Sequence, residues 1–493
     1  LIRIRQRQTA ARREIRWEIS LADAQDAPGG GLNNRLRAFA SALSPTSVRS
    51  AMARSGLAVL IGSLAATNIL RIGNNLILTR LLAPEAFGIV GVITSISVIL
   101  TLVTDLGFNV FIVRSPKWQD VRFLNVIWTI RLIRSAALTA VMFVGAGLFS
   151  TAFNKPELTA PIMATSFLFL LEGLRSLSPL TALRERRVSF ISMFEFAVFI
   201  IQMVVTIAVA LVIKSFWAII IGMYAGGIAH AVLSYTLFPG YSHRIAFDRE
   251  IGRELWAFAR VVIVSSVITI IIGQADKIFI GRALSLDLLG LYMLAVNLTT
   301  SALQLVATYV HRVLLPEYSH AAEQSVATLR SIYYRARWRL TLALAFLLGG
   351  GIGGGHLIVR ILFDERYLGA GVFVSLLCLA PLFSLVTKPA EQALISLGKV
   401  RSALEANVVR LAWIVIAAPL GYHFFGVVGM VAAFALIEAA AALYWWVRLR
   451  IAGLFDLNGE LAPMALAVLG AAIGLAADKG VDWLIAQDFI PNF

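Results

Sequence analysis

The sequence predicts an all-α polytopic membrane protein. Hydrophobic residues make up 59% of the 493 residues and charged residues only 14%, whereas soluble domains average about 25% charged residues. The mean hydropathy is +0.82. Apolar runs of about 20 residues, the length that spans a bilayer as a helix, recur along the chain. One motif occurs twice, which predicts that the chain is built from two similar halves.

The first 50 residues are polar and carry many arginines. We expect residues 1–50 to form a basic cytoplasmic arm that is disordered or partly helical. The alternative interpretation is a basic helix that lies on anionic lipid. The sequence begins with Leu1, which leaves open a fragment, a non-standard start codon or a later start at Met52.

Thirteen apolar segments follow the arm, and we predict that each one is a transmembrane helix. The tail that comes after them, 479–493, is either an interfacial helix or a truncated span. The predicted spans are 56–79, 86–108, 124–148, 158–178, 189–212, 216–237, 257–281, 288–310, 338–361, 370–394, 404–422, 425–446 and 461–478.

The basic residues between the spans predict the orientation of the chain. With the N-terminus in the cytoplasm, nineteen Lys and Arg residues lie in or beside the cytoplasmic connections and six lie on the opposite side. This is the distribution that the positive-inside rule describes. The formal charge of +15 follows from this placement, so it does not indicate a protein that binds nucleic acid.

Each copy of the duplicated motif covers the end of one span and the start of the next. The first copy follows the first span, and the second copy follows the seventh. The motif consists of an arginine, an acid five residues later and a glycine three residues after the acid. We expect the arginines to be interfacial anchors or to bond the acid, and the acids to lie at helix N-termini, where the helix dipole favours them. The copies are offset by 202 residues: Arg80, Glu85 and Gly88 in the first, and Arg282, Asp287 and Gly290 in the second.

Because the copies lie six spans apart, both face the same side of the membrane. The halves are therefore predicted to be parallel repeats related by an axis along the membrane normal, with a central lumen between them. The expected parts are an N-terminal six-helix lobe, a cytoplasmic linker, a C-terminal six-helix lobe and an extra C-terminal transmembrane segment with its tail. Their bounds are 51–237, 238–253, 254–450 and 451–493.

Polar side chains deep in the first and seventh spans predict the lining of this lumen. Arg71 lies eight residues before the end of its span, which is roughly 12 Å at 1.5 Å per residue, so we expect watery surroundings. One interpretation is that Asp276, Lys277 and Arg71 pair between helices and hold the halves together. The other is a polar gate or cationic wall that meets an anionic substrate. The candidate lumen residues are Arg71, Asn74, Asn75, Gln274, Asp276 and Lys277.

Four arginines near the cytoplasmic ends of spans are candidates for the entry site of a phosphorylated lipid head group. Guanidinium groups pair bidentately with phosphate, which makes arginine suitable for this role. Ordinary positive-inside placement also explains them. The four are Arg131, Arg134, Arg260 and Arg312.

The tenth span contains a proline between two charged residues. Pro389 removes a backbone hydrogen bond and opens a kink, and Lys388 and Glu391 share a helix face at i, i+3. Protonation of Glu391 would free Lys388, which suggests a switch that couples transport to a proton gradient. The alternative is a static pair within one helix. Four further acids in the spans cannot be ranked: Asp105, Glu172, Glu195 and Glu438.

Nothing in the sequence indicates a cofactor or an active site. There is no Walker A motif that would bind ATP, and the single cysteine, Cys378, excludes an intrachain disulfide. The six histidines lack metal-ligand spacing. The glycine-rich stretch 349–355 lies in an apolar helix, which favours close helix packing or a soft hinge over a nucleotide-binding loop.

The two motif copies carry a family resemblance. Residues 70–92, 274–298 and 310–320, together with Val103–Phe108, resemble the Wzx-type oligosaccharide flippases. More narrowly, the chain is similar to the bacterial polysaccharide branch of the multidrug/oligosaccharidyl-lipid/polysaccharide superfamily. The resemblance implies a MATE-like fold of two six-helix bundles, here with one or two extra helices and about 13 spans. The arginine-rich extension and the odd helix count depart from the family pattern.

The resemblance also implies a function and a location. A flippase of this kind moves polyprenyl-pyrophosphate-linked oligosaccharide across the bacterial inner membrane by ion-coupled alternating access, for exopolysaccharide or lipopolysaccharide synthesis. Its implied partners are the lipid-linked substrate, membrane lipids, and the polymerase and glycosyltransferases of the same pathway. No cofactor is expected.

Other functions stay open. A multidrug or metabolite antiporter of the same fold would be expected to have an acid-rich lumen for cationic drugs, whereas the deep charges here are mostly basic. A peptidoglycan-precursor flippase would share nearly every feature. From another class, a membrane-bound polysaccharide polymerase or glycosyltransferase would need a long extramembrane loop or a buried acid/base constellation, and the longest internal connection lacks both. A structural membrane scaffold is the remaining alternative.

Overall fold

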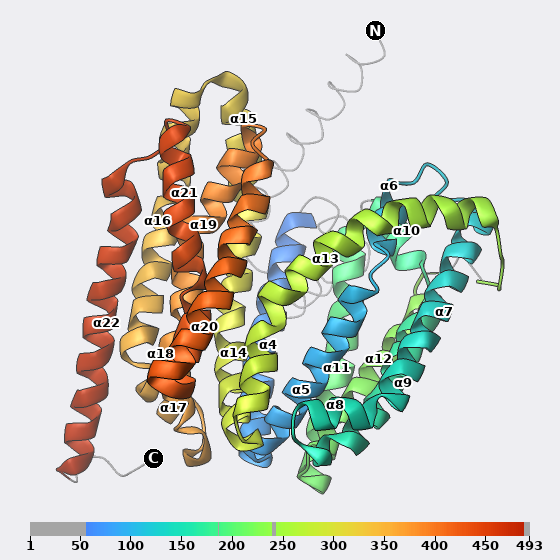
Figure 1. Cartoon of the computed structure of the whole chain (residues 1–493), viewed down its shortest axis with the longest axis horizontal. Coiled ribbons are helices and arrows are strands. Elements are labelled where there is room, and N and C mark those ends of the chain that lie inside the picture. Colours follow the sequence, from blue (N-terminus) through green and yellow to red (C-terminus); the bar gives the residue numbers. More distant parts are fainter. Residues whose placement is uncertain (1–55, 186, 239–242, 488–493) are drawn as a thin grey trace, which may run out of the picture. The chain divides into compact units, whose positions relative to one another are not determined.

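A computed structural model describes residues 56–185, 187–238 and 243–487 of the chain (Figure 1). The described residues form helices and connections without a β-strand, which confirms the predicted all-α class. Residues 1–63 and 64–493 separate into two compact units, and the fold below is that of the second. The predicted arm 1–50 and the end of the tail lie outside the described residues.

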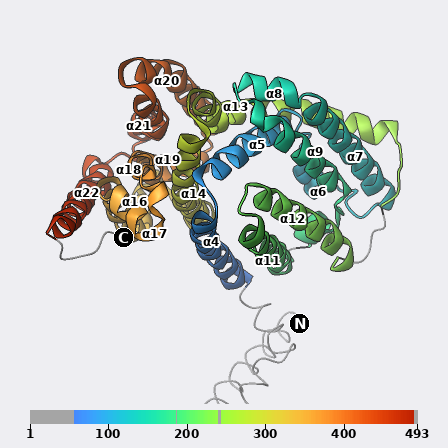
Figure 2. The ribbon, with the colours of Figure 1, turned by 90° about the horizontal axis from the view of Figure 1, so that it is seen from below.

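The N-terminal half of the fold, here called the N-lobe, runs from α4 to α12. In Figure 2, which looks along the helices, α7 and α9 lie side by side, as do α11 and α12. The elements are α4 (Gly56–Leu81), α5 (Pro84–Val103), α6 (Phe108–Arg114), α7 (Val121–Val144), α8 (Ala146–Ala152), the 3₁₀-helix η1 (Pro156–Leu158), α9 (Thr159–Leu174), α10 (Ser178–Arg184), α11 (Val188–Ile213) and α12 (Trp217–Thr236).

The C-lobe runs from α13 to α21 and is followed by one further long helix, α22. The elements are α13 (Arg249–Ala283), α14 (Leu286–Tyr309), the π-helix η2 (Val310–Leu314), α15 (Leu315–Gln324), α16 (Val326–Gly353), α17 (Gly355–Leu362), η3 (Glu365–Tyr367), α18 (Ala370–Leu377), α19 (Leu379–Ser396), α20 (Arg401–Ala435), α21 (Ile437–Ile451) and α22 (Leu457–Ala486).

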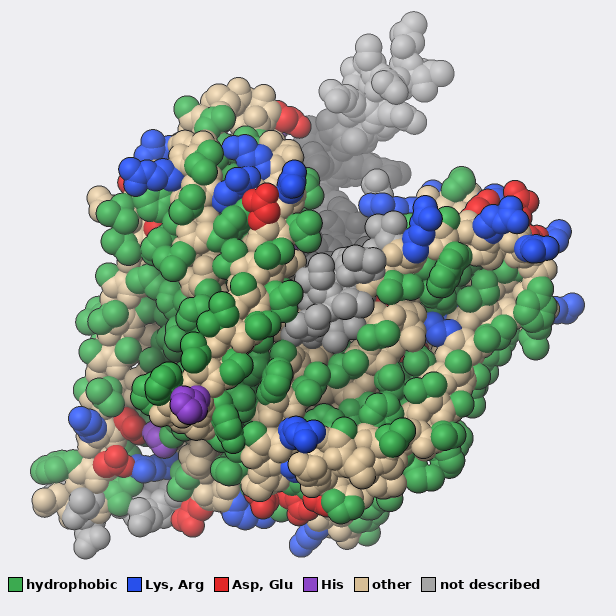
Figure 3. All heavy atoms as spheres, in the orientation of Figure 1, with side chains coloured by type: hydrophobic (Ala, Val, Ile, Leu, Met, Phe, Trp, Pro, Cys, Tyr) green, Lys and Arg blue, Asp and Glu red, His purple; other side chains and the backbone are tan. Residues whose placement is uncertain are grey.

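The chain is a multi-pass membrane protein. In the described part, nine helical segments are long and apolar enough to cross a membrane, or ten if the bent pair α16–α17 counts as one span. Figure 3 shows charged side chains gathered mostly toward the two ends of the helices, with mainly hydrophobic side chains between them. Each predicted span overlaps a helix, but the number of thirteen stays a prediction. One reason is that the 51-residue segment Arg401–Ile451 contains a break at Gly426, whose φ is +60°.

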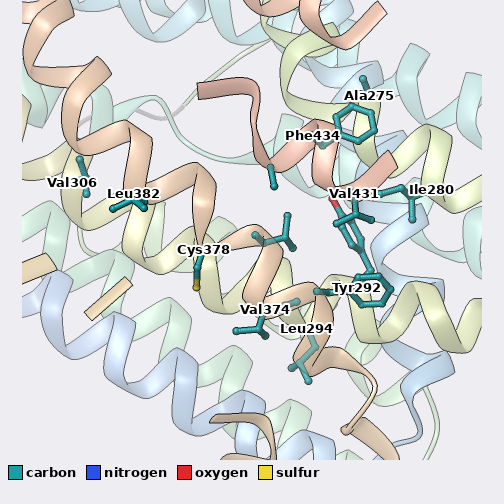
Figure 4. Close-up of a cluster of buried hydrophobic side chains, with 14 of the residues drawn as sticks. Ala275, Ile280, Tyr292, Leu294, Val306, Val374, Cys378, Leu382, Val431 and Phe434 are labelled. Carbon is teal, nitrogen blue, oxygen red and sulfur yellow. The ribbon is translucent and has the colours of Figure 1, made fainter. Parts of the chain in front are cut away.

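The duplicated motif forms a contact between α5 and α14. A Cβ atom on Gly88 would lie 2.1 Å from the carbonyl oxygen of Leu286, and one on Gly290 would lie 1.8 Å from the carbonyl oxygen of Pro84. Only glycine permits this close backbone approach. Gly88 and Gly290, and likewise Pro84 and Leu286, are 202 residues apart, as the motif copies are. Equivalent residues of the two repeats therefore contact each other reciprocally, as across a two-fold axis. A core of buried side chains from α13, α14, α18 and α20 continues from this contact (Figure 4).

Helix α13 begins earlier than the predicted seventh span. Asp248 caps it by accepting hydrogen bonds from the backbone N–H groups of Glu250 and Ile251. Ile251 and Leu255 then pack into an apolar cluster of the N-lobe that contains Phe123. The helix therefore starts against the N-lobe and ends in the C-lobe, because a cap and two apolar side chains let it extend into the predicted linker. The linker bounds stay a prediction.

The glycine-rich stretch of α16 packs against the extra helix α22. A Cβ atom on Gly349 would lie 2.0 Å from the carbonyl oxygen of Ala467, and one on Gly353 would lie 1.9 Å from that of Ala471. Helix α16 ends at Gly353 and the chain bends by 84° into α17. The stretch thus packs closely against another helix, which is one of the two predicted uses, and a soft hinge at the bend stays a prediction.

Candidate functional site

The predicted lumen residues of α4 are half-buried. The Arg71 guanidinium donates a hydrogen bond to Oε1 of Gln304 on α14, over 3.4 Å. The amide oxygen of Asn74 is buried and has no hydrogen-bond partner among the described residues. Helix α4 therefore presents polar groups whose hydrogen bonds are long or unmade.

The predicted lumen residues of α13 bond locally or to α14. Tyr292 on α14 donates a 2.6 Å hydrogen bond to Asp276, and the ammonium group of Lys277 donates to Oε1 of Gln274 over 3.1 Å. No ion pair joins Asp276, Lys277 and Arg71 in the part of the chain that the structure describes. The predicted pairing of Asp276, Lys277 and Arg71 is therefore not formed. Arg71 on α4 and Asp276 on α13 each bond a side chain of α14 instead. A lumen role stays a prediction.

The charged residues of the duplicated motif lie at helix ends. Glu85 and Asp287 are in the first turns of α5 and α14, as predicted. The Arg282 guanidinium donates to the carbonyl oxygen of Ala152 at 2.8 Å, rather than bonding the acid that follows it. Lys155 binds at the C-terminal end of α13, where its ammonium group donates hydrogen bonds to the carbonyl oxygens of Gly281 and Leu284 at 3.0 and 2.6 Å. Burial lowers the pKa of this lysine.

Two of the predicted head-group arginines are held by backbone carbonyl groups. Arg134 donates to the carbonyl oxygens of Thr101 and Thr104 at 2.6 and 2.8 Å, at the end of α5. Arg131 donates to the carbonyl oxygen of Arg175, just after the end of α9. Carbonyls at a helix C-terminus lack partners within the helix, so these arginines cap two helices. Arg260 is exposed on α13, and the side chain of Arg312 lies outside the described residues.

An open cavity of about 620 Å³ lies in the N-lobe and is lined by residues of α5, α9, α11 and α12. Its wall is mixed, with apolar side chains such as Phe169 and Met223 between polar ones. This is the character of a site that accepts water or a polar ligand. The polar residues that line it are Thr94, Ser97, Thr101, Thr165, Glu172, Arg175, Gln202 and His230.

Three titratable side chains of this cavity, Glu172, Arg175 and His230, lack a bonded partner among the described residues. The half-buried Glu172 makes no hydrogen bond or ion pair with any described residue, although it interacts through space with Arg131, Arg134 and Arg175. Nδ1 of His230 is buried without a hydrogen-bond partner in the described structure. The sequence left Glu172 unranked and gave His230 no role. The signal in the sequence that could have singled out Glu172 is an acid within an apolar run, followed three residues later by an arginine.

The predicted switch residues form their pair. The ammonium group of Lys388 and Oε2 of Glu391 are 3.3 Å apart, and both side chains are partly exposed. The adjacent Thr387 donates a 2.6 Å hydrogen bond to Glu438, which also receives two hydrogen bonds from Arg410, at 3.0 and 2.8 Å. A second, more deeply buried ion pair therefore lies beside the first. Whether either one couples transport stays a prediction.

The connection between the lobes is tied to the N-lobe through His243. Its ring stacks on Trp128, with centroids 5.7 Å apart, and Nε2 accepts a 3.0 Å hydrogen bond from the backbone N–H of Leu177. Burial, and then the nearby charge of Arg131, lower the pKa of His243 to about 4. The imidazole is therefore neutral at neutral pH.

Comparisons with known proteins give a family and a fold. The family model described as "Polysaccharide biosynthesis protein" matches residues 77–370. The teichuronic acid biosynthesis protein TuaB of Bacillus subtilis (strain 168) is 19% identical over 305 residues, 62% of either chain. The amylovoran biosynthesis protein AmsL of Erwinia amylovora is 24% identical over 235 residues, 46% of this chain and 59% of AmsL. The matches thus span less than two thirds of either relative.

Among solved structures, the lipid II flippase MurJ in an inward closed conformation is similar with a TM-score of 0.65 and 12% identity. The match covers 86% of this chain and 99% of that one. An inward-facing multidrug resistance transporter of the MATE family is similar with a TM-score of 0.55 and 16% identity, over 78% of this chain and 95% of that one. At these identities the likeness establishes the fold.

Proposed function

The chain belongs to the family of polysaccharide biosynthesis proteins, and from this premise we propose that it is a flippase in a bacterial inner membrane. Its substrate is a polyprenyl-pyrophosphate-linked oligosaccharide used for exopolysaccharide or lipopolysaccharide synthesis. The observation that carries the proposal is that a chain of this family has the fold of a lipid flippase. The N-terminus is cytoplasmic, and the polymerase and glycosyltransferases of the pathway are its partners.

The chemistry of such a substrate explains why a lumen with positive charge is useful. A sugar–pyrophosphate head is large and anionic, so its transfer through hydrocarbon without compensation is prohibitive. Arg71 and Lys277, on α4 and α13, supply positive charge that replaces part of the lost hydration. Their present hydrogen bonds are weak enough to exchange, because Arg71 bonds at 3.4 Å and Lys277 bonds only neutral oxygens. The lipid tail stays in the bilayer.

The contact between α5 and α14 supplies a place where the lobes close. It lies at the ends of α4 and α13 that carry Arg80 and Arg282, the side opposite the predicted cytoplasmic connections. Access from the periplasm then requires the backbones at Gly88 and Gly290 to separate. In this proposal the Lys388–Glu391 pair responds to the coupling ion, since protonation of Glu391 would remove the partner of Lys388.

Deletion of the gene tests the flippase proposal. In spheroplasts of the deletion strain, lipid-linked oligosaccharide should accumulate in a form protected from a membrane-impermeant glycosidase or lectin, and restoring the gene should relieve it. Accumulation that the probe can reach would place the defect after flipping and favour a polymerase. No accumulation at all would favour a drug or metabolite exporter of the same fold.

A further inference from the structure

Each lobe has a short connector at the same end of its helices, after α8 in the N-lobe and after α17 in the C-lobe (Figure 1). We call residues 153–158 the N-connector and residues 363–368 the C-connector. Both begin with phenylalanine and end with leucine, at a constant offset of 210 residues, and each contains a 3₁₀ turn, η1 or η3. The connectors are therefore equivalent parts of the two repeats.

The N-connector binds the first helix of the C-lobe. The ammonium group of Lys155, which is 8% exposed, donates hydrogen bonds to the carbonyl oxygens of Gly281 and Leu284 at the end of α13. The last carbonyl groups of a helix have no partner within the helix, and the helix dipole favours a cation there. The ring of Phe153 lies beside these bonds, 3.0 Å from a Cβ atom built on Gly281. The N-connector thus caps α13.

The C-connector binds the first helix of the N-lobe. The Arg366 guanidinium donates to the carbonyl oxygens of Thr79 and Arg80, each at 3.3 Å. The Tyr367 hydroxyl donates to the carbonyl oxygen of Leu82 at 2.8 Å. These acceptors lie at the end of α4, where the carbonyl groups again lack partners within the helix. The C-connector thus caps α4.

The two caps use equivalent acceptors. Thr79 and Gly281 are 202 residues apart, and so are Leu82 and Leu284, which is the offset of the copies of the duplicated motif. The same two backbone positions at the end of each first helix are therefore bonded by the connector of the opposite lobe. The repeats exchange caps next to the contact between α5 and α14.

We propose that these caps form a lock between the lobes, made of Lys155 in the N-connector and Arg366 and Tyr367 in the C-connector, and that this lock opens as one unit. Each cap joins one lobe to the other, so a movement that separates the lobes at this end must break both caps together. Water then has to bond the carbonyl groups of both helix ends, which favours two discrete arrangements of the lobes. The part of the lock in transport rests on the proposed flippase function, in which this end faces the periplasm.

Each cation of the lock has an acid in its own connector to bond when the lobes separate. Asp364 already bonds Arg366 at 3.0 Å, and Glu157 attracts Lys155 through space. A cation that leaves the opposite helix therefore keeps a partner of opposite charge within its own lobe. The bonds of the lock can for this reason be exchanged when the lobes move, with a carboxylate in place of the helix carbonyl groups.

Amide hydrogen exchange of the full-length protein in lipid nanodiscs, measured by mass spectrometry, tests whether the lock opens as one unit. Lys155→Met removes the ammonium group and keeps an unbranched side chain. Peptides that cover the end of α13 should exchange about tenfold faster, the factor for a loss of about 1.4 kcal/mol. Peptides that cover the end of α4 should exchange faster by the same factor, because one opening exposes both ends.

Tyr367→Phe tests the lock from the other connector. This substitution removes one hydroxyl group and leaves the buried ring in place, so the test does not depend on the folding of Lys155→Met. Exchange should again accelerate at the ends of both α4 and α13. Wild-type exchange in α16 and α22, which pack against each other through glycines, shows that each variant is folded.

The effect on the distant helix distinguishes a lock from two ordinary helix caps. Faster exchange confined to the helix that loses its own donor would overturn the proposal, and so would wild-type exchange at both helix ends in both variants. Lys479→Met, at an exposed lysine of α22, is the control for loss of a positive charge and should change neither end. Because no substrate is added, coupled opening of the two ends would stand even if the deletion experiment removed the flippase proposal.

Discussion

Gly88 on α5 and Gly290 on α14 lie against each other's helix, and each occupies a site where a side chain would overlap backbone. A Cβ atom on Gly88 would lie 2.1 Å from the carbonyl oxygen of Leu286 and 3.2 Å from the backbone nitrogen of Gly290. Equivalent residues of the two repeats therefore meet at a shared contact. At this contact the duplicated motif of the sequence forms a symmetric interaction in the fold.

The first prediction concerns this contact. Gly88→Val or Gly290→Val should force α5 and α14 apart and lower stability by about 1–3 kcal/mol, the range for overpacking, with loss of export. Gly147→Val is the matched control, because a Cβ built at this exposed glycine of α8 would meet nothing within 4 Å beyond its own stretch of helix. Thermal unfolding of the purified proteins and polymer output at equal expression would measure both effects. A Gly88 variant as stable and active as the control would show that the contact is dispensable.

The positions of the helices and the motif could be predicted from the sequence, but the bonding of the charged residues could not. Hydropathy reports how deep a residue lies along a helix, and so Glu85 and Asp287 were correctly placed in first turns. It does not report which way a side chain points. Arg131 and Arg134 donate hydrogen bonds to backbone carbonyl groups of other helices. Every residue has a backbone carbonyl group, so these acceptors cannot be recognised from the residue types in the sequence.

Glu172 illustrates the same limit. Its place in an apolar run shows that the acid is costly, but only the arrangement of α5, α9, α11 and α12 shows that it faces a cavity. By contrast, Lys388 and Glu391 could be paired in advance because they are three residues apart on one helix. Interactions within a helix can be inferred from spacing, and interactions between helices require the fold.

The second prediction concerns the attachment of α22. Arg337 on α16 and Glu460 on α22 form an ion pair whose side chains are 2% and 0% exposed. Glu460→Ala should destabilise the protein by about 3–5 kcal/mol, because it leaves a buried guanidinium unpaired. Asp482→Ala removes the partner of Arg360 at the other end of the same helix, where Asp482 is 55% exposed, and should change stability by less than about 1 kcal/mol. Equal effects of the two substitutions on thermal unfolding would contradict the assignment.

The third prediction concerns the candidate lumen. Arg71→Ala and Lys277→Ala should each reduce export while the protein remains folded in the membrane, because neither side chain forms an ion pair with a described residue. Arg450→Ala, in the last turn of α21, is the control for loss of a positive charge elsewhere. Normal polymer output from both lumen variants at matched expression would remove these residues from the substrate path.

The fourth prediction concerns pH and the connection between the lobes. Burial lowers the pKa of His243 to about 4, below the value of about 6.5 for an exposed histidine. An unfolded chain therefore binds a proton at this position before the folded one does. The contribution of His243 to stability is complete above about pH 6.5 and is lost as the pH falls toward about 4.

Replacement of the ring should remove this dependence. His243→Gln should lose less stability than the wild type between about pH 6.5 and about pH 4, by about 1 kcal/mol after allowance for solvent screening of a partly exposed ring. His320→Gln is the control, because His320 is 77% exposed and should leave the wild-type profile unchanged. Thermal unfolding at a series of pH values measures the difference between the variants, which cancels the titration of all other groups. Parallel profiles for the wild type and His243→Gln would show that the ring is protonated equally readily in the folded and unfolded chains.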